Sequence, residues 1–158
     1  MTDKFDHLMM ARALEQAQQA QAIGEVPIGA VVYRGYQVLA QAHNLRESQH
    51  DPTAHAEVVA IREAAQSLGT QDLSGCILYT SCEPCPMCLS AAYWSRVDHV
   101  YYANTRADAA GIGFDDSELY DEVAKPIEAR SLSITRLEND DAVSVMQKWA
   151  ADPTNRRY

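Results

Sequence analysis

Two short segments hold side chains that can bind a metal ion. The first is 53–57, with the sequence TAHAE, and the second is 83–88, with the sequence EPCPMC. Either alone is weak evidence, because a lone histidine is usually structural and a C-x-x-C pair is also typical of redox proteins. Together, His55, Cys85 and Cys88 supply the three protein ligands typical of a catalytic zinc, whose fourth tetrahedral position is left to water.

Glu57 has a chemical role that differs from metal binding. A carboxylate beside a metal-activated water can take its proton and return it to a substrate nitrogen and to the departing amine. Because His55 and Glu57 are two residues apart, they face one site only if they lie at the opening of a helix. Cys85 and Cys88 are three residues apart, so they share one face of a first helical turn.

Cys82 leaves two alternative metal sites open. With Cys85 and Cys88 it forms C-x-x-C-x-x-C, but the further cysteine of an iron–sulfur run does not follow. Cys82 would also complete the four protein ligands of a structural zinc.

Hydrophobic periodicity and turn residues predict alternating strands and helices. A first helix is expected between Asp3, as N-cap, and Gly24, and a second from the Asp51-Pro52 pair to Gly69. The remaining expected elements are strands over 28–33, 37–44, 76–81, 99–103 and 132–137, helices over 84–96, 115–123 and 140–150, and a loop over 105–113. The strand, helix and strand over 76–103 imply a parallel crossover. We therefore expect one α/β domain over 1–158, a three-layer α/β/α fold with a central five-stranded mixed sheet.

The charge of the chain bears on its partners. It has 22 acidic and 13 basic residues and a formal net charge of -9, so its field disfavours a nucleic acid and favours a small substrate. Four cysteines without an export signal are expected to be reduced thiols in the cytoplasm. No segment approaches the apolar length of a membrane span.

The motifs H-x-E and P-C-x-x-C together resemble the signature of the cytidine-deaminase-like superfamily of zinc deaminases. The resemblance extends from the strand at 28–32 through both motif segments to the C-terminal region. It implies hydrolytic removal of an amino group from a nucleobase-type substrate, with one zinc per subunit bound by His55, Cys85 and Cys88 and protons moved by Glu57.

Other segments bear on the branch of this superfamily. The run DPTAHAE over 51–57 is shared by tRNA adenosine deaminases and guanine deaminases. Four other parts of the chain look like bacterial guanine deaminases: 79–88, 93–96, 113–116 and Tyr158. In contrast, Glu25-Val26-Pro27 resembles the tRNA-editing branch, and Ile28 supplies no aromatic ring for base stacking.

The guanine deaminase resemblance implies roles for further residues. Asn44 and Asp116 would recognise polar edges of the purine, with Asp116 as a possible second proton carrier. The backbone around Ala56 would hydrogen-bond the base, Trp94 would line the pocket, and Tyr158 would cap the site from the partner subunit of a homodimer. The expected reaction converts guanine into xanthine and ammonia. The alternatives are a deaminase of the tRNA wobble adenosine and a catalytically silent, zinc-stabilised binding module, against which the presence of Glu57 argues.

Overall fold

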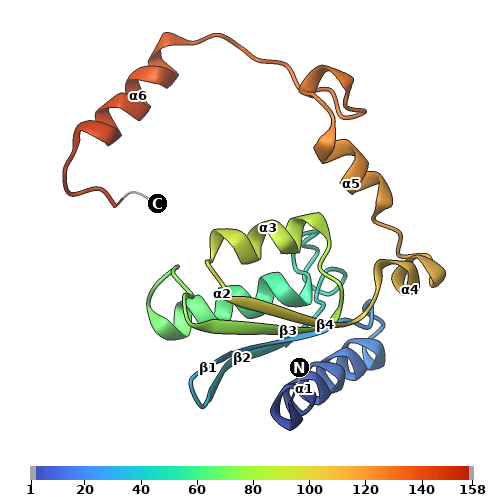
Figure 1. Ribbon diagram of the computed structural model, residues 1–158. Coiled ribbons are helices and arrows are strands. Elements are labelled where there is room, and N and C mark those ends of the chain that lie inside the picture. Colours follow the sequence, from blue (N-terminus) through green and yellow to red (C-terminus); the bar gives the residue numbers. More distant parts are fainter. Residues whose placement is uncertain (1–2, 157–158) are drawn as a thin grey trace. The chain divides into compact units, whose positions relative to one another are not determined.

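The computed structural model describes residues 3–156 (Figure 1). The chain divides into two compact units, Met1–Tyr120 and Asp121–Tyr158. The metal-binding motifs both lie in the first unit, whose fold is therefore the one that positions them.

A mixed sheet of four strands forms the centre of the first unit, in the order β2-β1-β3-β4. The strands are β1 (Gly29–Arg34), β2 (Gln37–His43), β3 (Cys76–Cys82) and β4 (His99–Asn104). β1 pairs antiparallel with both β2 and β3, while β3 and β4 are parallel and are connected through α3 (Pro86–Trp94). The α/β class and the parallel crossover are confirmed.

The expected fifth strand over 132–137 is wrong. Within the described residues this segment has no strand, and the apolar side chains of Leu132, Ile134 and Leu137 are exposed. Their spacing suggested a strand, but no neighbouring strand of their own unit offers a hydrogen-bonding edge to them. The sheet therefore has four strands.

Helices cover both faces of the sheet. On one face, α1 (Lys4–Ala22) packs Met9 and Ala13 against Val31, Tyr33 and Tyr79. The other face carries the larger core, in which α2 (Ala56–Leu68) and α3 pack on the sheet (Figure 1). Figure 1 shows these helices on opposite sides of the strands, as expected for three layers.

Gly29 allows α1 to approach β1 closely. A Cβ added at this position would collide with Ala13 O and lie 2.5 Å from Ala17 N, both backbone atoms of α1. The backbone N–H of Gly29 donates to Ser81 Oγ at 3.0 Å, which ties this end of β1 to β3.

The first helix begins and ends as expected. The Asp3 side chain caps its start in a reciprocal capping box with Asp6, and Gly24 follows its end with φ of +81°. The second helix also ends as expected, since Gly69 is left-handed with φ of +66°.

The start of α2 differs from expectation. Asp51 does not cap this helix, because its carboxylate accepts from the backbone N–H of Thr53 at 2.8 Å and from Thr53 Oγ1 at 2.7 Å. These bonds close a local turn that holds the next residues outside the helix. The helix therefore begins at Ala56, and His55 becomes its N-cap residue.

Two other helices also depart from expectation. The third begins at Pro86 rather than Pro84, so Cys85 is its N-cap residue. The segment expected as a loop over 105–113 contains α4 (Arg106–Gly111), which begins with a capping box between Thr105 and Asp108.

The second unit contains the end of α5 (Ser117–Ala124), the short helix η1 (Ile127–Ala129) and α6 (Asp140–Ala151). None of its described residues, 121–156, is buried. In the described chain no helix has the length and apolar character needed to span a membrane.

Candidate metal centre and active site

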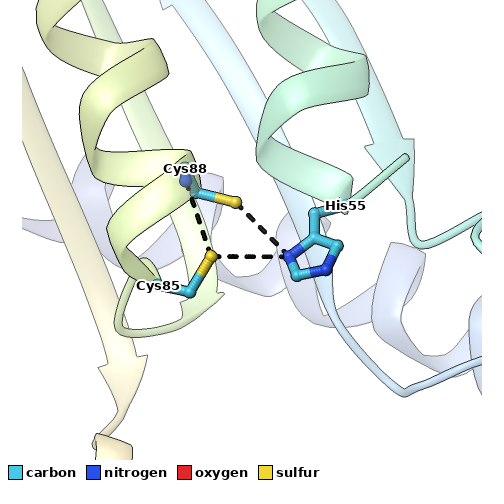
Figure 2. A group of neighbouring side chains, drawn as sticks. All are labelled: His55, Cys85 and Cys88. Carbon is cyan, nitrogen blue, oxygen red and sulfur yellow. Dashed lines mark hydrogen bonds between the residues drawn. The ribbon is translucent and has the colours of Figure 1, made fainter. Parts of the chain in front are cut away.

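The openings of α2 and α3 bring three metal-binding side chains together (Figure 2). His55 Nδ1 lies 3.6 Å from Cys85 Sγ and 3.5 Å from Cys88 Sγ. All three ligand atoms lie within 4.8 Å of one another. Because His55 and Cys85 are both N-cap residues with extended backbone, their side chains leave the helix axis and converge on one point.

These separations fit a tetrahedral zinc ion. With Zn–N near 2.05 Å and Zn–S near 2.3 Å, tetrahedral angles place nitrogen and sulfur about 3.6 Å apart. Both measured nitrogen–sulfur distances match this value. Among the described residues, the group close enough to share one ion consists of His55, Cys85 and Cys88 alone. Cys82 is outside it, so the geometry favours a centre with three protein ligands over a closed structural one.

The protein favours an anionic sulfur at this point. A hydrogen bond from Cys88 lowers the pKa of Cys85 to about 4, with a further contribution from His55. The backbone N–H of Cys88 also points at Cys85 Sγ, at 3.5 Å. The hydrogen bond with Cys85 raises the pKa of His55. A thiolate is the form that binds metal, and the N-terminal end of a helix stabilises it.

Glu57 lies beside the cluster and is 2% exposed. Its Oε1 accepts from Thr80 Oγ1 at 3.2 Å, and its Oε2 accepts from Cys88 Sγ at 3.5 Å. Burial raises the pKa of Glu57, as is useful for a group that both takes and returns a proton. At the second helical position after the N-cap, its side chain reaches the same space as His55.

Asp116 is held close to the ligand-bearing loop by a chain of contacts. Arg106 Nε lies 3.6 Å from Asp116 Oδ1, and the guanidinium carbon of Arg106 lies 3.6 Å from the ring centroid of Tyr120. Tyr120 in turn donates its hydroxyl to Pro84 O at 3.0 Å, next to Cys85. Burial raises the pKa of Asp116, which Arg106 partly offsets.

A cavity of about 340 Å³ is connected to the cluster through Phe114, although none of His55, Glu57, Cys85 and Cys88 lines it. Its wall includes Phe114, whose ring centroid is 6.0 Å from that of His55, and Cys82, which directly follows Ser81 at the end of β3. The other lining residues are Val26, Pro27, Ile28, Asn104, Asp108, Ala109 and Ile112. This volume and largely apolar wall suit a small planar ligand.

Asn44 and Ala56 lie near the same point. Asn44 is 2% exposed, and its backbone N–H donates to Ile28 O at 3.0 Å. The next residue, Leu45, donates to Ala54 O at 2.9 Å, which keeps this loop against the start of α2. As the first residue of that helix, Ala56 has a backbone N–H with no intrahelical acceptor.

The structure does not bring every residue of the expected site to the cluster. Trp94 is the last residue of α3, about 9 Å of helical rise beyond Cys88, and is 67% exposed. Tyr158 lies outside the described residues.

Three residues that contact the site were not identified from sequence. Thr80 lies two residues after Leu78 on β3 and therefore on the same face, the one covered by α2, but nothing in the sequence pairs it with Glu57. Arg106 belongs to α4, whose capping box was the available signal. Glu25, in the EVP segment, is buried and bonded to Asn44.

A protein-family comparison matches residues 3–104 to the cytidine and deoxycytidylate deaminase zinc-binding region. The guanine deaminase of Bacillus subtilis (strain 168) is 46% identical over 132 residues, covering 84% of this chain and 85% of that protein. The X-ray structure of guanine deaminase from Bacillus subtilis superposes with a TM-score of 0.93 at 40% identity, covering 99% of both chains. The tRNA-specific adenosine deaminase of the same strain is 47% identical over 97 residues, covering 61% of this chain and 60% of that protein.

Proposed function

The chain belongs to the cytidine and deoxycytidylate deaminase family and is a hydrolytic deaminase, and from this membership we propose that it converts guanine and water into xanthine and ammonia. One observation carries the choice of guanine. Similarity to guanine deaminase covers 84% of the chain by sequence and 99% by structure, whereas similarity to the tRNA deaminase covers 61%.

Zinc bound by His55, Cys85 and Cys88 would supply a Lewis acid that activates water for attack on the ring carbon carrying the amine. His55 and the two cysteines lie at the starts of separate helices, so a bound ion would also link α2 to α3.

Glu57 moves the protons. Its carboxylate accepts a proton from the attacking water and gives it to the ring nitrogen next to the amine-bearing carbon. It then passes the second proton of the water to the amine, which leaves as ammonia. Thr80 Oγ1 donates to Oε1 of Glu57 at 3.2 Å. The other oxygen, Oε2, lies beside Cys88 Sγ and is therefore the one that remains for proton transfer.

Recognition of the base is assigned to Asn44, Asp116 and the N–H of Ala56. Asn44 and Ala56 flank the start of α2, and Asp116, held by Arg106, would orient the exocyclic amine or carry a second proton. Ile28 and Phe114 provide the apolar wall against which the ring packs.

We further propose a single deaminase domain over residues 1–158 that works as a cytoplasmic homodimer. The unit 121–156 exposes apolar side chains, among them Leu137, Val145 and Met146, and a second copy of the chain would cover them. Tyr158 would then cap the site of the partner subunit. All four cysteines are free thiols, the form that a reducing compartment maintains.

The second candidate substrate is a tRNA adenosine, which the match to tRNA-specific adenosine deaminase and the EVP segment favour. The net charge of -9 opposes it, because binding an anticodon loop requires contacts to phosphates.

Ammonia release distinguishes the candidates. The zinc-loaded protein is given guanine, adenine, cytosine, their nucleosides and a tRNA anticodon stem in parallel. Ammonia from guanine, with xanthine identified as product, supports the proposal, whereas release from the stem alone overturns it in favour of tRNA editing. Release from no substrate by a zinc-loaded, folded enzyme would support a silent binding module.

A further inference from the structure

Glu25 is a buried carboxylate that lies outside the catalytic machinery assigned above. It is 5% exposed, and its backbone N–H donates to Ala20 O at 3.0 Å, which fixes it just beyond the end of α1. A carboxylate at this depth must be compensated by hydrogen bonds, and the identity of its donors indicates what it does.

Four donors surround the two carboxylate oxygens. Oε1 accepts from the backbone N–H of Ser48 at 2.7 Å and from Ser48 Oγ at 2.8 Å. Oε2 accepts from the backbone N–H of Glu47 at 3.2 Å and from Asn44 Nδ2 at 3.0 Å. Burial raises the pKa of Glu25, but the bonds from Ser48 lower it further, so the net pKa lies below its usual range. The group is therefore an ionised acceptor at neutral pH.

An ionised carboxylate can only accept hydrogen bonds, so the Asn44 atom facing it must be the amide nitrogen. This contact decides the orientation of an amide that could otherwise be turned either way. The carbonyl oxygen Oδ1 is consequently turned away from Glu25. No hydrogen bond from another described residue reaches it.

Backbone bonds place Asn44 between the cavity and the metal-binding cluster. Its N–H donates to the carbonyl oxygen of Ile28, which lines the cavity, and the N–H of Leu45 donates to the carbonyl oxygen of Ala54, directly before His55. Among the described residues, Arg106 Nε is the one fully buried side-chain polar atom without a hydrogen-bond partner, so Asn44 Oδ1 is not completely enclosed although the residue is only 2% exposed.

We propose that Glu25 is a positioning residue that sets base selectivity by fixing the Asn44 amide. Oδ1 and the remaining Nδ2–H then face the pocket side by side, as an acceptor and a donor. This pair selects a base edge that carries an N–H next to an acceptor, and it rejects an edge whose ring nitrogen is alkylated. The inference rests on the proposed deamination of guanine, which carries such edges.

The test compares the zinc-loaded wild type with Glu25→Gln. The new amide can donate to Asn44 and let it flip, which would present two N–H donors to the pocket. We expect normal zinc content, a KM for guanine about ten- to a hundredfold higher and a smaller change in kcat. Discrimination between guanine and its 1-, 7- and 9-methyl derivatives, measured as inhibition constants, should fall by a similar factor.

Two further variants control this result. Glu47→Gln removes an exposed carboxylate from the same loop and should behave as the wild type. Ser48→Ala removes one donor to Glu25 without touching Asn44 and should shift KM in the same direction by a smaller factor. Unchanged discrimination in Glu25→Gln, accompanied only by a lower Tm, would overturn the positioning role.

A measurement without substrate separates this inference from the proposed function. In 1H–15N spectra of the wild type, one Nδ2 proton of Asn44 should be shifted downfield and exchange slowly with water, because it is bonded to Glu25. Two rapidly exchanging protons at ordinary side-chain amide shifts would overturn the inference even if guanine is the substrate. A protected proton in an enzyme inactive on guanine would support the geometry and refute the guanine assignment alone.

Discussion

Replacing Glu57 by glutamine separates proton transfer from structure. Glutamine has nearly the same shape, so its amide oxygen can keep the bond from Thr80, and its NH2 group can face Cys88. The three metal ligands are unchanged. The variant should therefore fold and bind one zinc per chain while lacking the group that takes a proton from water.

General acid–base catalysis contributes about two to four orders of magnitude to turnover. Because Glu57 is 2% exposed, bulk water cannot readily take its place, and we expect kcat to fall by about 10²- to 10⁴-fold. This loss corresponds to about 3–5 kcal/mol of transition-state stabilisation. KM for guanine should change much less, since recognition is assigned to other residues.

The assay follows xanthine formation by ultraviolet absorbance at saturating guanine, with zinc measured by atomic absorption on the same samples. Glu63→Gln is the matched control, because it makes the same change on an exposed position of the same helix. A Glu57→Gln enzyme with full zinc content and a kcat within about threefold of the wild type would refute the proton-transfer role.

Three further predictions test the fold and the site. Gly29→Ala should lower the unfolding free energy by about 3 kcal/mol and Tm by roughly 6–12 °C in a circular dichroism melt, because the added methyl group meets the α1 backbone; an unchanged Tm would contradict the close approach. Chelation should abolish activity and lower Tm, and added zinc should restore both, since a bound ion would link α2 and α3. Folding lowers the pKa of Glu25, so the ionised carboxylate stabilises the folded state at pH values above its ordinary pKa of 4.5. This stabilisation is lost as pH falls below 4.5 towards the lower pKa of the folded state. The Tm difference between wild type and Glu25→Gln should therefore shrink on acidification, and a difference that grew would contradict the ionised state.

Local signals in the sequence predicted most of the first unit. The capping residue Asp3 and the left-handed Gly69 marked helix ends, because their effects depend on neighbouring backbone alone. The prediction that Asp51 caps α2 was wrong for a related reason. Its side chain can accept either from a backbone N–H of the helix or from the nearby Thr53, and the sequence does not show which of the two it prefers. The strand expected over 132–137 failed because strand formation requires a distant partner, which a local pattern cannot supply.

The clustering of His55, Cys85 and Cys88 was predictable because the spacing of the two cysteines, together with an H-x-E segment, carries the information within a few residues. The groups around them were not. Thr80 and Glu57 are 23 residues apart, and Glu25 and Asn44 are 19 apart, so only the folded chain shows that they are bonded.

The separation of tasks along the chain has a practical consequence for redesign. The metal ligands and Glu57 come from two helix openings, while the residues assigned to base recognition lie mainly on the loops around 25–28, 44–48 and 114–116. A library of variants confined to those loops, with Asp116 kept, would leave the metal ligands and Glu57 unchanged while it samples other heterocyclic amines as substrates. Selectivity can thus diverge while the hydrolytic machinery is inherited intact.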